Sequence, residues 1–211
     1  KNYSEKFTLD LQDLYNENKE VFDKLHNATL DIIDHYSSKT EESVHWEAWL
    51  TEIFYNESLE GYLRYMALVR LTFIHFNYRN FEGLVEKYNA IDQWFLEGKF
   101  YSKRILLNYY SNRLLLHARF KEYEKAIHYG YLSIRQKNND YIHYVNNLCA
   151  ILLRTNKNKD ALNMMREAYP EMRLTPSFHN KIGFISFYMR CLMNNEQHKN
   201  AENFAETFLK A

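Results

Sequence analysis

Apolar residues recur at helical spacing along most of the chain, and small residues mark matched points of its second half. Ala126, Ala161 and Ala201 stand 35 and then 40 residues apart, each inside a stretch with apolar residues three or four positions apart. A period of this length is typical of stacked helical hairpins, in which no single hairpin can bury its apolar face alone. The pattern therefore predicts an all-α chain built as an array of antiparallel helix pairs.

The same periodicity predicts two N-terminal helical segments followed by four helix pairs with short polar joints. The N-terminal segments are expected at 4–36, as one amphipathic helix or as a helix pair broken near Asn16, and at 41–55. Pro170 is expected to end the helix before it, because proline lacks the N–H that continues a helix. The expected pairs are 59–78 with 81–95, 102–119 with 123–137, 141–154 with 159–169, and 177–193 with 198–209.

The composition supports a large folded core and excludes several classes of protein. Apolar residues make up 46% of the chain and aromatic residues 17%, which is too much for a disordered protein. No apolar run reaches the length that spans a bilayer, so we expect no membrane insertion and a cytoplasmic location. Cys149 and Cys191 are expected to be buried thiols rather than a disulfide. Because the sequence begins at Lys1, we expect it to be a segment of a longer chain.

Charge is distributed unevenly, although the formal net charge is zero. Residues 1–60 carry 14 acidic and 5 basic side chains, whereas residues 61–211 carry 13 acidic and 22 basic ones. Such a difference in sign between segments bears on what each surface attracts. We therefore expect an acidic helical segment, residues 1–58, to pack on or shield a basic repeat array, residues 59–211. The alternative is that both surfaces are simply solvated.

The array resembles the tetratricopeptide repeat family. The stretch RFKEYEKAIHYGYLSI, residues 119–134, is similar to the second-helix half of that motif, and residues 145–170 are similar to almost a whole repeat. The resemblance implies a right-handed superhelix, or α-solenoid, of antiparallel helix pairs, here with extra N-terminal helices. It also implies a protein- or peptide-binding scaffold or sensor domain that uses a concave groove and performs no chemistry.

In this family the first helix of each pair lines the groove, and transferring that register selects candidate binding residues. Asn and Arg recur at equivalent positions, where their side chains are expected to project into solvent. An Asn amide donates and accepts, so it suits a peptide backbone, and Arg suits a carboxylate. We therefore expect a protein or an extended, acidic peptide as the partner; alternatively, these residues are only family consensus. The candidates are Arg70, Asn77, Asn112, Arg119, Asn147, Arg154 and Arg190, with Asn194 at the last equivalent position.

The second hypothesis is a helical nucleic-acid-binding module or ribonuclease. The basic array with its many Tyr and Phe residues is compatible with phosphate contacts and base stacking. Arg70 and His75 have the spacing of a catalytic Arg–His pair in one family of helical ribonucleases, which predicts that they face a shared cleft. No metal-binding or phosphate-loop motif is present, so we expect no metal and no cofactor. An acidic face of one helix is interpreted as solvated rather than metal-binding: Asp31, Asp34 and His35.

Overall fold

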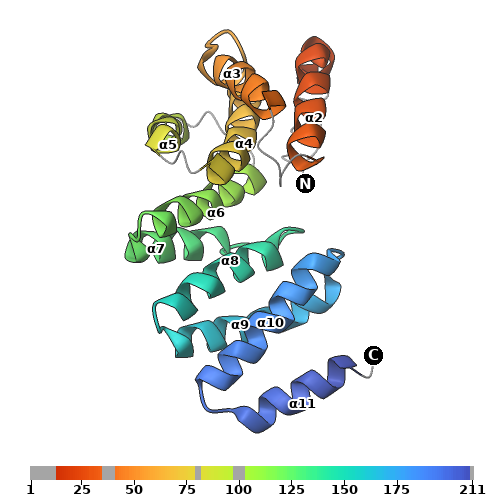
Figure 1. Cartoon of the computed structure of the whole chain (residues 1–211), viewed down its shortest axis with the longest axis vertical. Helices are drawn as coiled ribbons and strands as arrows, with labels where there is room; N and C mark the ends of the chain where they lie inside the picture. The colour runs from red at the N-terminus through yellow and green to blue at the C-terminus, as the bar shows by residue number, and fades with distance from the viewer. Residues whose placement is uncertain (1–12, 35–40, 79–81, 97–102, 210–211) are drawn as a thin grey trace. The chain divides into compact units, whose positions relative to one another are not determined.

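The structure is a computed structural model that describes residues 13–34, 41–78, 82–96 and 103–209 (Figure 1). Every regular element in these ranges is an α-helix, which confirms the predicted all-α class. The chain divides into two compact units, Lys1–Ser102 and Lys103–Ala211. Unit 1 contains α2 (Lys19–Asp34), α3 (Glu41–Tyr55), α4 (Gly61–Tyr78) and α5 (Glu82–Leu96). Unit 2 contains α6 (Lys103–Arg119), α7 (Tyr123–Ser133), α8 (Tyr141–Arg154), α9 (Asn158–Leu174), α10 (Phe178–Asn194) and α11 (His198–Leu209).

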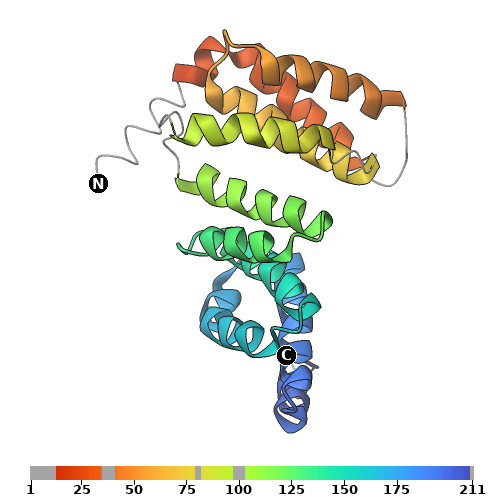
Figure 2. The ribbon, with the colours of Figure 1, turned by 90° about the vertical axis from the view of Figure 1, so that its left-hand side faces the viewer.

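In unit 1, α4 is the helix that α2, α3 and α5 all contact, and the four helices lie alongside one another (Figure 2). The contacts are mainly apolar, with Leu25 of α2, Leu50 of α3 and Leu68 of α4 at 2% exposure or less. The chain forms a turn at Asn18, which agrees with the broken helix pair, one of the two alternatives for residues 4–36. None of the helices described here is long and apolar enough to cross a membrane.

Two arginines of α4 tie the preceding helices to it through backbone carbonyls. Arg64 Nε donates to the Phe54 carbonyl at 2.8 Å, and Arg70 Nε donates to the Leu25 carbonyl at 3.2 Å. The Phe54 carbonyl lies in the last turn of α3, where helix carbonyls have no partner within the helix. The described residues of the acidic segment therefore pack on α4. Their apolar side chains contact this helix, and their backbone carbonyls accept hydrogen bonds from its arginines. Unit 1 continues through α5, whereas the charge pattern changes near residue 60.

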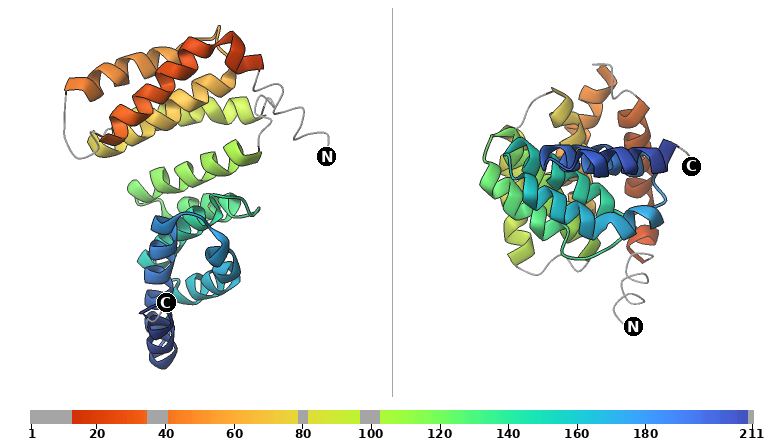
Figure 3. Two further views of the ribbon diagram at one scale, coloured as in Figure 1. Left: turned by 90° about the vertical axis from the view of Figure 1, so that its right-hand side faces the viewer. Right: turned by 90° about the horizontal axis from the view of Figure 1, so that it is seen from below.

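The three helix pairs of unit 2 share one turn between their first and second helices (Figure 3). Lys121, Asn156 and Glu196 have φ angles of 62°, 59° and 61°, and they keep the 35- and 40-residue spacing of the repeat. The next N–H of each turn returns to the carbonyl five positions back, which is the Schellman ending of a helix. These bonds all measure 2.9 Å: Glu122 to His117, Lys157 to Leu152, and Gln197 to Leu192.

Small residues lie where the second helices cross their neighbours. The three matched alanines are 5% exposed or less: Ala126, Ala161 and Ala201. Gly130 shows how close the helices come, because a Cβ added there would lie 2.6 Å from Leu148 Cδ1 and 2.7 Å from Leu114 Cδ1. The small residues therefore recur along the chain at the same interval as the tight helix crossings, as the repeat pattern predicted.

Two predicted helix ends are wrong. The helix expected to stop before Pro170 continues to Leu174, because proline removes only one N–H and the following Met172, 2% exposed, belongs to the core. The helix expected to reach residue 137 ends at Ser133. There the Ser133 hydroxyl donates to the Gly130 carbonyl at 2.7 Å, so the N–H of residue 134 bonds Leu132 instead of continuing the helix.

Enlarging the matched alanine of the central pair should overpack a helix crossing. We expect Ala161→Leu to lower the free energy of unfolding by roughly 1–3 kcal/mol, because Ala161 is 0% exposed and has no room for three further carbons. Ala150→Leu in α8 is the matched control, since Ala150 is partly exposed. Urea denaturation of both variants measures the difference, and equal stability of the two would show that the repeat register is wrong.

The shared turn should become more stable with glycine at its left-handed position. Lys121 has a φ of 62°, which a side chain with a Cβ adopts at a cost, so we expect Lys121→Gly to raise the free energy of unfolding by about 0.5–1 kcal/mol. Asn156→Gly should gain less, because asparagine tolerates this conformation better than lysine. Thermal melts measure both effects. Lys125→Gly, inside α7, is the control and should be destabilising; a similar loss in Lys121→Gly would contradict the prediction.

Candidate partner-binding face

Each first helix of unit 2 carries one row of exposed or half-buried residues at positions i, i+4, i+7 and i+11. In α8 this row is His143, Asn147, Ala150 and Arg154. The equivalent rows of α6 and α10 lie 35 residues before and 40 residues after it, which places like positions in columns. We call the three rows the first-helix face. Its members are Asn108, Asn112, Leu115, Arg119, His143, Asn147, Ala150, Arg154, Gly183, Phe187, Arg190 and Asn194.

The asparagines of this face are held in place by their amide nitrogens. Asn112 Nδ2 donates to Asn108 Oδ1 at 3.1 Å, one turn back in α6. Asn147 Nδ2 lies 3.1 Å from Ser111 Oγ and so links α8 to α6. The sequence analysis expected the Asn147 side chain to project into solvent. Its hydrogen bond to Ser111 gives it a structural role as well. The amide oxygens of Asn112 and Asn147 are the groups left to accept from a ligand.

Two arginines of the face lie in the last turns of α6 and α8, and the third lies one turn earlier in its helix, α10. Arg119, Arg154 and Arg190 are all exposed, and they come from α6, α8 and α10 respectively. The Arg154 guanidinium lies 5.6 Å from the centre of the Tyr123 ring, a cation–π contact that orients it while leaving its N–H groups at the surface. The structure thus places three of the predicted arginines on one face of unit 2.

Charge is segregated between the two kinds of helix in unit 2. The first helices α6, α8 and α10 contain seven Lys and Arg residues and no Asp or Glu. All nine acidic residues of 103–211 lie in the second helices or in the joints. Sequence reasoning missed this pattern because it counted charge over long segments; a count helix by helix would have found it. The first helices therefore form the part of unit 2 that attracts acidic groups.

Arg70 and Asn77 belong to unit 1, whereas the first-helix face is defined within unit 2. Arg70 donates to the carbonyls of Leu25, at 3.2 Å, and Met66, at 2.9 Å. Burial lowers the pKa of this guanidinium from its ordinary value. Its hydrogen bonds serve the packing of α2 on α4. Asn77 lies in α4, and its side chain is outside those that the structure describes.

The Arg–His spacing of α4 does not produce a shared cleft. His75 is 2% exposed, and its Nε2 lies 2.8 Å from Glu47 Oε1 of α3. Arg70 is engaged by carbonyls of α2 and α4 instead. His75 joins α4 to α3 and Arg70 joins α4 to α2, so the two side chains have separate structural partners. This arrangement does not favour the ribonuclease hypothesis. The side chains of Asp31, Asp34 and His35 lie outside the described part of the chain.

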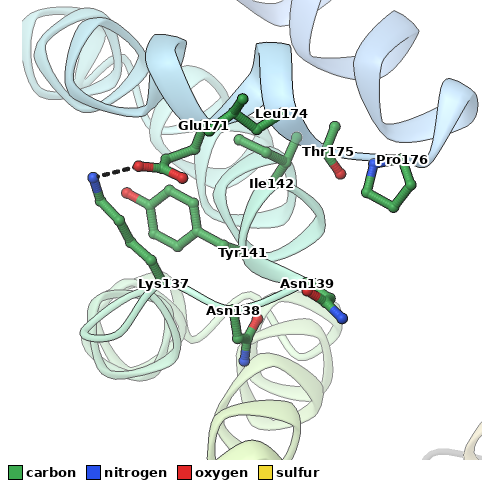
Figure 4. Close-up of a pocket in the computed structure, with 9 residues that line it drawn as sticks. All are labelled: Lys137, Asn138, Asn139, Tyr141, Ile142, Glu171, Leu174, Thr175 and Pro176. Atoms are coloured by element: carbon green, nitrogen blue, oxygen red, sulfur yellow. Dashed lines mark hydrogen bonds and ion pairs between the residues drawn. The ribbon is translucent and has the colours of Figure 1, made fainter.

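A separate pocket of about 210 Å³ lies between the α7–α8 joint and the end of α9 (Figure 4). An ion pair crosses its rim, with Lys137 Nζ 2.7 Å from Glu171 Oε1, and Tyr141 forms one wall. The Thr175 hydroxyl lines it and is buried without a hydrogen-bond partner among the described residues. Sequence reasoning did not single out these residues, because they come from joints rather than from the repeated first helices.

Comparisons with known proteins define the fold. No family model matches the sequence. No curated protein matches it either. Two crystal structures from Podosopora anserina, described as "putative kinesin light chain nearly identical TPR-like repeats", are similar in structure, one of them carrying a single substitution. Their TM-scores are 0.55 and 0.56 at 10% and 9% sequence identity, over 97% of this chain and 92% of theirs.

At such low identity the similarity concerns the fold alone. The chain has a TPR-like helical repeat fold, an α-solenoid of stacked helix pairs, as the sequence resemblance predicted. The shared turns and the buried alanines of unit 2 are the physical basis of this fold.

A buried histidine lies beside this face, between α6 and α7. His117 Nδ1 is 2.6 Å from Glu122 Oε2, and its ring stacks on Tyr129 with the centroids 5.2 Å apart. Arg113 lies over the same tyrosine ring at 5.2 Å. Burial lowers the pKa of His117 from its ordinary value; the hydrogen bond to Glu122 partly opposes this effect and Arg113 reinforces it. Folding therefore favours the neutral imidazole.

The stability of unit 2 should fall as the solution is acidified from pH 7.5 to 5.5. The pKa of His117 is lower in the folded chain than in the unfolded one, where it is about 6.5, so the unfolded chain takes up more protons in this range. The resulting loss is absent above the unfolded pKa and grows below it. We expect His117→Gln to show a smaller drop in urea midpoint than the native chain. Identical pH profiles would contradict the assignment.

Proposed function

We propose that the chain is a non-catalytic binding scaffold or sensor domain that holds an extended acidic segment of a partner protein along the first-helix face. The TPR-like fold supports a protein-interaction role, since stacked helix pairs form extended surfaces built from equivalent positions. Chemistry of the face favours recognition over catalysis. Its permanently charged side chains are arginines, which remain protonated and serve poorly as general acids or bases. The imidazole of His143 lies 3.2 Å from Asn147 Nδ2, and burial lowers its pKa from the ordinary value.

The observation that carries the proposal is the absence of acidic residues from α6, α8 and α10. A ligand carboxylate that approaches these helices meets Arg119, Arg154 or Arg190 and no charge of its own sign on the same helices. The acidic residues of unit 2 are kept on second helices and joints, so the attraction is directed to one kind of helix. Complementary charge of this sort increases the rate of encounter and disfavours partners of the wrong sign.

Three groups of residues divide the work of binding in this proposal. The arginines pair with ligand carboxylates through charge-assisted hydrogen bonds. The amide oxygens of Asn112 and Asn147 accept from backbone N–H groups of the ligand, which makes that contact independent of its side chains. The apolar members of the face, Leu115 and Phe187, contact the aliphatic parts of ligand side chains. An extended conformation suits such a row because its backbone groups are not engaged in a helix.

The test uses a fluorescein-labelled peptide of alternating Glu and Ser residues as the acidic probe and fluorescence anisotropy as the readout. Arg154→Glu should weaken binding by about tenfold or more, and the loss should shrink as salt rises, because an exposed attraction becomes a repulsion. Asn112→Ala removes one acceptor and should weaken binding by roughly 0.5–1.5 kcal/mol. Neither variant should change the melting temperature by more than a few degrees, since both residues lie at the surface.

The matched control is Arg173→Glu, which makes the same charge change at an exposed position of α9. It should leave the affinity nearly unchanged. Equal losses in Arg154→Glu and Arg173→Glu would show that only overall charge matters. Tighter binding of a single-stranded RNA oligonucleotide than of the acidic peptide, with the same dependence on Arg154, would assign the face to nucleic acid instead.

A further inference from the structure

A second row of each first helix packs toward the next first helix of unit 2. In α8 this row is Ile142, Asn146, Cys149 and Leu153, and all four are 8% exposed or less. It faces α10: Asn146 Nδ2 donates to the Asn180 carbonyl at 3.0 Å, and Cys149 Sγ lies 3.5 Å from Cys191 Sγ. In α6 the equivalent row, 35 residues earlier, is also buried: Leu107, Ser111, Leu114 and Ala118.

The same row of α10 is exposed except at Met189, which is half-buried. Forty residues after the α8 row stand Ile182, Ser186, Met189 and Met193, with Phe178 one turn before them. Phe178, Ile182 and Met193 are 76%, 50% and 53% exposed, in contrast to the buried α8 row. We call these five residues the α10 stripe. Of the three equivalent rows, the α10 stripe is the one that no described helix covers.

The fold itself shows what shape of ligand fits such a stripe. In α6 and α8 the equivalent row is covered by the first helix of the next pair. The α10 stripe repeats the spacing of those rows, with Ser186 as a small residue near its centre, where a second helix can approach closely. It therefore has the form of a seat for an amphipathic helix rather than for an extended chain.

Charge decides between a second copy of the chain and a different partner. At 100° per residue, Lys181 flanks the stripe on one side and Arg190 on the other, and α10 contains no acidic residue. Two α10 helices packed stripe to stripe would bring like charges together along both edges. A helix with acidic residues beside its apolar face would instead pair with both flanks, as in the e and g positions of coiled coils.

We propose that the α10 stripe is a second docking site, which binds an amphipathic helix of a partner protein with acidic residues flanking its apolar face. The site goes beyond the extended-peptide site of the first-helix face. It lies on a neighbouring side of α10, so either site can exist without the other. The docked helix continues the stacking of first helices in unit 2 and covers Phe178, Ile182 and Met193.

The test uses designed peptides of about 20 residues, a length at which an isolated helix becomes stable in water. One peptide carries a Leu and Ala face flanked by Glu, a second has Lys at the flanks, and a third has the first composition in scrambled order. The Glu-flanked peptide should bind with an affinity at least about tenfold higher than either of the others, measured by anisotropy. Ile182→Glu and Met193→Glu, both at exposed positions, should each weaken it by about tenfold or more without changing the melting curve.

A second readout reports directly on the stripe. Ser186→Cys places a thiol at its centre that an environment-sensitive dye can label, because the native Cys149 and Cys191 are 0% exposed. The Glu-flanked peptide should shift the dye emission to the blue, and the scrambled peptide should not. Arg154→Glu, on the first-helix face of α8, is the control that should leave this binding unchanged.

Any of three results would overturn the proposal. Equal binding of the Glu-flanked and scrambled peptides, or unchanged affinity in Ile182→Glu, would show that the stripe is not a helix seat. A concentration-dependent dimer in sedimentation equilibrium, abolished by Ile182→Glu, would assign the stripe to a second copy of the chain. The two proposals can be contradicted independently, because the Ile182→Glu variant should still bind the alternating Glu and Ser peptide.

Discussion

The close approach of second helices to first helices is the constraint on which the rest of unit 2 depends. A Cβ at Gly130 would require Leu114 and Leu148 to shift, and Ala161 is fully buried at the equivalent crossing of the next pair. Only at such a distance can the short Schellman turn join the two helices, with a non-glycine residue held at positive φ. The crossing and the turn fix each hairpin, and the hairpin fixes which rows of the first helices remain outside.

Columns of equivalent residues follow from this repetition. Because each pair repeats the same turn, positions 35 or 40 residues apart take equivalent places on neighbouring first helices. A charge bias in one helix type then becomes a surface property of the whole unit. The absence of acidic residues from α6, α8 and α10 has this effect, while acidic residues of second helices, such as Glu171 with Lys137, form ion pairs elsewhere.

The sequence predicted the features that depend on local periodicity. The bounds of α8 and α11 agree with the prediction, and the matched alanines are buried as expected, because spacing of apolar and small residues determines both. The end of α9 was missed because the burial of Met172, a tertiary contact, outweighs the single N–H that Pro170 removes. The end of α7 was missed because a local bond of the Ser133 hydroxyl competes with the helix.

For the candidate site, the sequence could predict which side chains share a face, but not which partners those side chains have in the fold. Register transfer selected Asn112, Asn147 and Arg154, which lie on one face of unit 2, but it could not show that Asn147 also bonds Ser111 of the preceding first helix. Arg70 has the same register as Asn112, yet its guanidinium is engaged by carbonyls. A repeat pattern determines the position of a residue on its helix. The partners of its side chain depend on the neighbouring helix, and that helix differs between the two units.

The two proposed sites both attract acidic ligands, so charge cannot tell their partners apart. Shape must do so. The first-helix face presents amide oxygens beside arginines, and a helical ligand has no free backbone N–H groups in its middle turns to give them. The α10 stripe presents only Ser186 among apolar side chains, so an extended chain would lose backbone hydrogen bonds to water there without replacement. Each surface thus favours one ligand conformation because of the backbone groups that the other conformation would leave unsatisfied.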